Sequence, residues 1–196
     1  LWLSERDQNS IPDGSAPLID DWKWPGAQKT LSTKKQLEAG HRYFIRMEVH
    51  DTGGLAQAKL YWSSTRQQKE IIPPINLYSE PFLITPEDSG TRAVQGNGNG
   101  LNGEYFNDND LVQYAFAQTV PSINYNWGFN PPATSLPTDN FSVRWTGWIE
   151  PRYSDLYTFS VVADDGARLW LSEKDQTSIP DGGTPLIDDW NWPGTQ

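Results

Sequence analysis

Apolar and polar side chains alternate along several short stretches of the chain. Between Tyr43 and Val49, apolar residues occupy every second position, and Arg46 and Glu48 lie between them, which is typical of a strand with one buried face. Residues 56–62, 141–145 and 157–161 alternate in a similar way. None of the sequence shows a convincing helical stripe, and clusters of Asp and Gly predict turns between the strands. The pattern favours an all-β fold, an antiparallel sandwich or barrel.

A long internal repeat sets the expected organisation of the chain. Residues 1–28 return as residues 169–196 with changes at six positions, an offset of 169 − 1 = 168 residues. We therefore expect an internal window, slightly longer than one period, from an array of tandem repeats of about 168 residues. Residues 81–100 lose the alternation and collect Pro, Gly, Asn and Ser, as a linker does.

The repeat and the linker divide the chain into two expected halves. Residues 1–80 read as the C-terminal half of one repeat, and residues 101–196 as the N-terminal half of the next. Half a sandwich leaves strand edges and apolar faces uncovered, so each half needs completion. The two halves could complete each other within the chain, as in a circular permutation. Alternatively, neighbouring repeats or chains of the same protein could complete one another head to tail, which would build a filament.

Charge and composition narrow the classes of partner. The chain has 25 acidic and 15 basic residues and a net charge of −10, which argues against nucleic acid and anionic membrane surfaces and favours cations. It contains no cysteine, so disulfides, thiolate zinc sites and cysteine catalysis are excluded. No segment approaches the roughly 20 apolar residues of a membrane-spanning helix, and we expect no membrane insertion.

Read from residue 101, the order of motifs resembles a known family. GLNGEYF at 100–106, FSVRWTGW at 141–148, DDGARLW at 164–170 and LIDDW at 186–190 follow one another, and the closing part of the pattern stands earlier, in 37–64. This order is similar to that of the protective-antigen fourteen-kilodalton domain, a β-sandwich of bacterial toxins, glycosidases and yeast adhesins. The resemblance implies an antiparallel β-sandwich in an extracellular or cell-surface protein.

The resemblance also implies a calcium site. In the yeast adhesins of this family, two adjacent aspartates joined by a cis peptide bind Ca²⁺, which holds vicinal sugar hydroxyls; here the matching residues are Asp164 and Asp165. A second loop of the adhesins adds an asparagine, and the loop at that place in this chain begins with His50 and Asp51 and has no asparagine. We take Asp51 as the third metal-ligand candidate. The alternative is that Asp165-Gly166 is simply a hairpin turn.

A second acidic pair stands beside tryptophans. Asp188 and Asp189 precede Trp190 and Trp192, and tryptophans next to carboxylates can form a platform on which a sugar stacks. In the alternative interpretation, Trp190 fills the core and one aspartate caps a turn. The run of Asn and Asp at 107–110 has the composition of a calcium loop but lacks its glycine and distal glutamate, so we expect a solvated turn.

No catalytic arrangement is recognisable in the sequence. His41 and His50 accompany no nucleophile motif, and Glu150 is the only isolated carboxylate near aromatics. We therefore expect a protein that is not an enzyme. The leading hypothesis is calcium-supported glycan binding or adhesion. The alternative is a structural repeat of an extracellular fibre, sheath or stalk.

Overall fold

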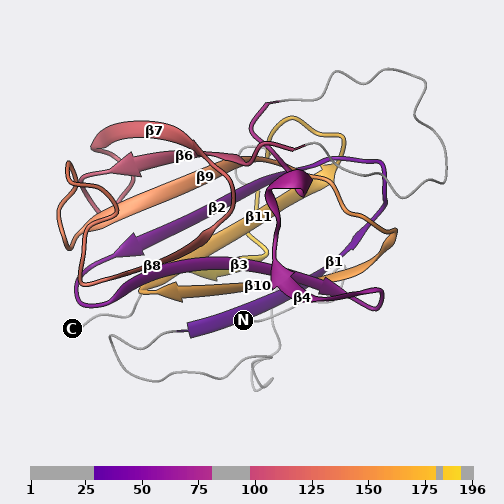
Figure 1. Ribbon diagram of the computed structural model, residues 1–196, viewed down its shortest axis with the longest axis horizontal. Helices are drawn as coiled ribbons and strands as arrows, with labels where there is room; N and C mark the ends of the chain where they lie inside the picture. The colour runs from indigo at the N-terminus through magenta and orange to yellow at the C-terminus, as the bar shows by residue number, and fades with distance from the viewer. Residues whose placement is uncertain (1–28, 81–97, 180–182, 191–196) are drawn as a thin grey trace.

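The protein is a two-layer sandwich of β-sheets (Figure 1). In the computed structural model, the described residues are 29–80, 98–179 and 183–190. The strands are β1 Lys29–Leu37, β2 Tyr43–Asp51, β3 Ala56–Ser64, β4 Gln67–Ile71, β5 Leu77–Tyr78, β6 Leu101–Phe106, β7 Tyr114–Val120, β8 Asn124–Gly128, β9 Phe141–Ile149, β10 Asp155–Asp164, β11 Gly166–Lys174 and β12 Ile187–Asp189, with a 3₁₀ turn at Pro74–Asn76. No helix in these ranges is long and apolar enough to cross a membrane.

Both sheets are antiparallel, which confirms the predicted fold class. The smaller sheet has the order β1-β10-β3-β4, with β8 also paired to β3. The larger sheet has the order β12-β11-β2-β9-β6-β7, with β5 also paired to β9. Alternation alone left two architectures open, a sandwich and a barrel. The structure is a sandwich.

Alternation along the strands directs one face of each sheet into the core. Tyr43, Ile45, Met47 and Val49 of β2 are each at most 3% exposed, as predicted from their spacing. Aromatic side chains supply much of the core volume, because each buries a large apolar area. The largest fully buried ones are Trp62, Trp145, Tyr105, Tyr157, Phe141 and Phe159.

Strands from the first and second parts of the chain pair with one another in both sheets. β2 lies between β9 and β11 in the larger sheet, and β10 lies between β1 and β3 in the smaller one (Figure 1). The segments 29–80 and 98–190 therefore complete each other within one chain. Residues 1–28 and 81–97 lie outside the described part, and the tandem array beyond this chain stays a prediction.

The outer face of the larger sheet carries a buried ion cluster that alternation alone does not reveal. Register places Glu48 of β2 opposite Arg144 of β9 and Arg168 of β11, with Nε–oxygen distances of 2.8 and 2.9 Å. Arg46 also donates to Glu48, at 2.7 Å from Nε. Burial alone would raise the pKa of Glu48, which is fully buried, but the guanidinium groups hold it below its usual value.

The pairing between the two segments predicts where stability resides. Leu60 on β3 is 1% exposed and lies opposite Val161 of β10. Leu60→Ala should lower the free energy of unfolding by about 2–5 kcal/mol, because it leaves a cavity between the sheets. Leu156→Ala on β10, where the side chain is 46% exposed, should change it by less than about 0.5 kcal/mol. Urea denaturation measures both values, and equal effects of the two substitutions would contradict the packing described.

Candidate functional site

Three connections cross between the two sheets at the same end of the sandwich. They are 51–56 between β2 and β3, 128–141 between β8 and β9, and 164–166 between β10 and β11. Each carries one or more aspartates: Asp51, Asp139, and the pair Asp164-Asp165. The fold thus gathers carboxylates that are distant in sequence.

The pair Asp164-Asp165 is the junction at which the chain changes sheets. β10 ends at Asp164, β11 begins at Gly166, and the two strands belong to different sheets, so the hairpin alternative for this turn does not apply. The peptide bond between the two aspartates is cis, as the family resemblance implied. Gly166 is required by a close approach, because a Cβ there would lie 2.1 Å from Nε2 of His50.

Asp51 is a buried carboxylate without a hydrogen-bond partner. Asp51 is 1% exposed, and neither of its carboxylate oxygens accepts a hydrogen bond from the described residues. Burial, followed by repulsion from Asp165, Asp139 and Asp164, raises its pKa to about 7. The backbone N–H of Asn140 offsets part of this rise, although it lies outside hydrogen-bond geometry. A carboxylate in this position gains stability from any cation that reaches it.

The neighbouring aspartates differ in burial and in the hydrogen bonds that their carboxylates accept. Asp164 is 4% exposed, and burial, together with repulsion from Asp165, raises its pKa to about 6. One oxygen of Asp165 accepts hydrogen bonds from the backbone N–H and the hydroxyl of Thr52, at 2.8 and 2.6 Å. Asp139 accepts one from the backbone N–H of Gly54, at 3.1 Å. These bonds tie the three connections together around Asp51.

The oxygen donors at this end of the sandwich can be compared with what a metal ion needs. Among the described residues, no three His, Cys, Asp or Glu side chains converge into a ready-made metal site. Calcium takes six to eight oxygens, including backbone carbonyls and water. The oxygens available here are the two unpaired ones of Asp51, with Asp164 and Asp165 near enough to repel them.

The two aspartates of the second acidic pair lie in different surroundings. Trp190 stacks on the His50 ring at a centroid distance of 4.5 Å, and the Arg168 guanidinium lies 3.9 Å from its centroid. The half-buried indole thus lies on the outer face of the sheet instead of filling the core. Asp189 pairs with Lys29 at 2.9 Å, whereas Asp188 is exposed. Trp192 lies outside the described residues.

Other polar residues singled out in the sequence have structural partners. The Asp108 carboxylate accepts hydrogen bonds from the backbone N–H groups of Asp110, Val112 and Gln113, so the segment 107–110 is a capped turn, as expected. Glu150 binds Arg42 at 3.1 Å.

Sequence reasoning did not single out Asp139. It stands in the long connection between β8 and β9, without a motif around it. Only the crossing of the sheets brings it to Asp51, which the spacing of residues along the chain could not indicate.

The raised pKa values of Asp51 and Asp164 should make the free energy of unfolding, measured in chelator, depend on pH. Between pH values of about 4 and about 7, the folded chain retains a proton on Asp51 that the unfolded chain has lost, so stability should fall as pH rises through this range. Asp51→Asn removes this ionisation and should raise the urea midpoint at about pH 8 while flattening the pH profile. Asp188→Asn removes a charge from an exposed position and should leave the profile unchanged. A profile of Asp51→Asn that coincides with the wild type would contradict the assignment.

Comparison with known proteins places this architecture in a family. The PA14 domain model matches residues 97–194. The chain is also 38% identical, over 179 residues, to the anti-sigma-I factor RsgI3 of Acetivibrio thermocellus; the match covers 91% of this chain and 25% of the relative. The chain therefore spans about a quarter of the length of that relative. No solved structure matches the chain. Sequence match and fold agree, and the chain belongs to the PA14 domain family.

Proposed function

We propose that this chain is a non-catalytic module that binds glycans with the support of Ca²⁺ at the sheet-crossing end. The observation that carries the proposal is Asp51, a fully buried carboxylate with both oxygens unpaired. Asp164 and Asp165 stand close enough to raise its pKa by repulsion. A bound divalent cation would neutralise these charges and use the unpaired oxygens.

The residues of this site have distinct parts in the proposal. Asp51, Asp164 and Asp165 hold the ion, and Thr52 orients Asp165 through two hydrogen bonds to one of its oxygens. Calcium accepts more oxygens than these residues supply, so it can also bind neighbouring hydroxyl groups of a sugar. Asp139 fixes the 51–56 connection through Gly54.

Exposed apolar side chains on the connections that carry Asp51 and Asp139 support binding of a sugar instead of a bare ion. Gly128 of β8 pairs with Ala56 of β3. Phe129 follows Gly128 in the 128–141 connection, and Leu55 precedes Ala56 in the 51–56 connection. Phe129 is 70% exposed and Leu55 49% exposed. An exposed ring next to hydrogen-bonding groups is the usual composition of a carbohydrate site, because sugars have apolar faces and polar edges.

The relative suggests the setting in which such a module acts. Its name describes an anti-sigma factor, a protein that controls a sigma factor. We infer that this chain is the ligand-binding part of a longer regulatory protein and meets its glycan outside the cell. The second candidate function is structural. The sequence of residues 1–28 recurs at 169–196, which favours an array of such modules in which repeats bind one another.

A catalytic role has little support in the geometry. Glycoside hydrolysis uses two carboxylates on opposite walls of a cleft. Here Asp164 and Asp165 are adjacent in one connection, and Glu150 is paired with Arg42.

A glycan array of the whole chain, run in calcium and in chelator, tests the proposal. Binding to a defined class of sugar should occur in calcium and be lost in chelator. Asp164→Asn should reduce calcium-dependent binding by roughly tenfold or more, since a metal ligand is lost. Phe129→Ala should weaken sugar binding without changing calcium affinity. Asp188→Asn serves as the matched control and should bind like the wild type. A folded chain that binds no glycan in calcium would overturn the proposal in favour of the structural array.

A further inference from the structure

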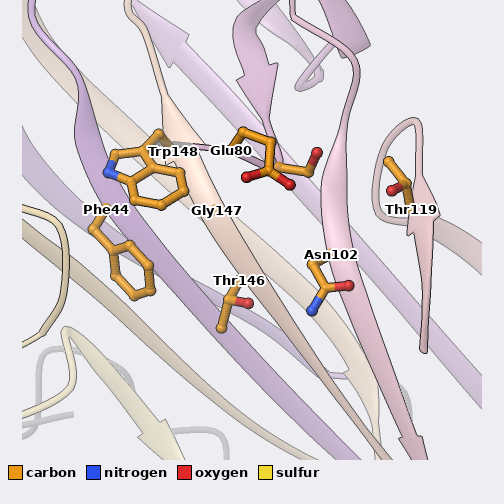
Figure 2. Close-up of a pocket in the computed structure, with 8 residues that line it drawn as sticks. Phe44, Glu80, Asn102, Thr119, Thr146, Gly147 and Trp148 are labelled. Carbon is orange, nitrogen blue, oxygen red and sulfur yellow. The ribbon is translucent and has the colours of Figure 1, made fainter. Parts of the chain in front are cut away.

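A pocket lies on the outer face of the larger sheet, far from the aspartates. It has a volume of about 360 Å³ and is lined by Phe44, Ser79, Glu80, Asn102, Thr119, Thr146, Gly147 and Trp148 (Figure 2). Phe44 stands seven residues before Asp51 on β2, a separation of about 23 Å along an extended strand. The pocket is therefore a separate feature from the sheet-crossing end.

The strand register produces the floor of this pocket. Asn102 of β6 lies opposite Thr119 of β7 on one side and Thr146 of β9 on the other. Their side chains form a row of one amide and two hydroxyl groups across three strands. Within the described part of the chain, none of the three side chains has a hydrogen-bond partner. The row thus presents free donors and acceptors to the pocket.

One wall of the pocket is aromatic and fixed in place. Phe44 and Trp148 are cross-strand neighbours and meet edge to face, with ring centroids 5.2 Å apart. The Trp148 indole N–H donates to the backbone carbonyl of Gln176 at 3.0 Å, which fixes the ring. Figure 2 shows Phe44 and Trp148 on one side of the pocket, with Thr146 and Asn102 farther across it.

The remaining wall is the end of segment 77–80. Asn99 holds Ser79 through two hydrogen bonds, at 3.1 Å to its backbone N–H and 2.9 Å to its hydroxyl. Gly147 allows this segment to lie against β9, because a Cβ at that position would be 2.4 Å from the Tyr78 carbonyl oxygen. Glu80 is exposed and is the only ionisable group among the lining residues.

We propose that this pocket, between Trp148 and the Asn102-Thr119-Thr146 row, is a second glycan subsite that takes an uncharged sugar unit. Its volume lies within the range of about 300–1,000 Å³ typical of small-molecule sites. An aromatic wall faces the apolar side of a pyranose, and the amide and hydroxyl groups pair with sugar hydroxyls. Glu80 accepts hydrogen bonds from hydroxyl groups but repels carboxylate and sulfate groups, and the net charge of −10 adds to this repulsion.

The inference rests on glycan binding as the proposed function, but not on calcium. With one subsite at the sheet-crossing end and one on the sheet face, a long polysaccharide could engage both, and the second contact would be intramolecular. Occupation of the pocket alone requires no metal, since its lining offers hydrogen bonds and an aromatic wall.

Affinity electrophoresis of the whole chain in gels that contain a soluble polysaccharide tests the inference. The uncharged probes are mixed-linkage β-glucan and xylan, and polygalacturonate is the acidic probe. The wild-type chain should be retarded by an uncharged probe and much less by polygalacturonate. The double substitution Asn102→Ala and Thr119→Ala should weaken binding to the uncharged probe roughly tenfold, since hydrogen bonds to the sugar are lost. Thr158→Ala on β10 is the matched control and should have no effect.

Further experiments distinguish binding at this subsite from binding at the calcium site. The effect of the double substitution should persist in chelator, and Glu80→Gln should increase retardation by polygalacturonate. Loss of binding in Asp51→Asn with full binding in the double variant would overturn the second subsite and leave the proposed function intact. If the double variant loses polysaccharide binding while neither chelator nor Asp51→Asn changes binding by the chain, the result would support the pocket and contradict the calcium site. A folded wild-type chain that neither uncharged probe retards, or that polygalacturonate retards equally, would overturn the inference.

Discussion

The insertion of β2 between β9 and β11 is the interaction on which the rest of the structure depends. This strand comes from the first part of the chain and its two neighbours from the second, so the larger sheet forms only when both parts meet. Its inward side chains supply core volume. Its outward residue Glu48 joins the arginines of both neighbours, and its last residue, Asp51, reaches the junction between β10 and β11. Core, surface cluster and candidate site are thus consequences of one pairing.

Two buried carboxylates on this strand illustrate two ways of meeting the cost of desolvation. Glu48 is surrounded by arginine side chains, and its pKa is lowered. Asp51, three residues later, has no such cation among the described residues, and its pKa is raised to about 7. A buried charge normally acquires a partner or is neutralised. The contrast identifies Glu48 as a structural group and supports the proposal that Asp51 binds a cation.

The sequence predicted the parts of this account that depend on local pattern. Alternation in β2 identified its buried face, and the motif order identified the family, including the cis junction at Asp164. It did not predict Asp139 as a neighbour of Asp51, because the crossing of two sheets brings the two together. The Glu48 cluster and the row formed by Asn102 depend on the register of several strands. Alternation cannot reveal these, because it places residues on a face without naming their cross-strand neighbours.

The fold completes itself within one chain, and we propose that it thereby brings Asp51, Asp164 and Asp165 together to bind calcium. A crystal structure of the chain grown in calcium, with anomalous scattering used to locate the ion, tests this most directly. The account predicts a single strong peak at the sheet-crossing end, about 2.3–2.6 Å from carboxylate oxygens of these residues. A well-ordered sandwich with this position empty in excess calcium would contradict the account.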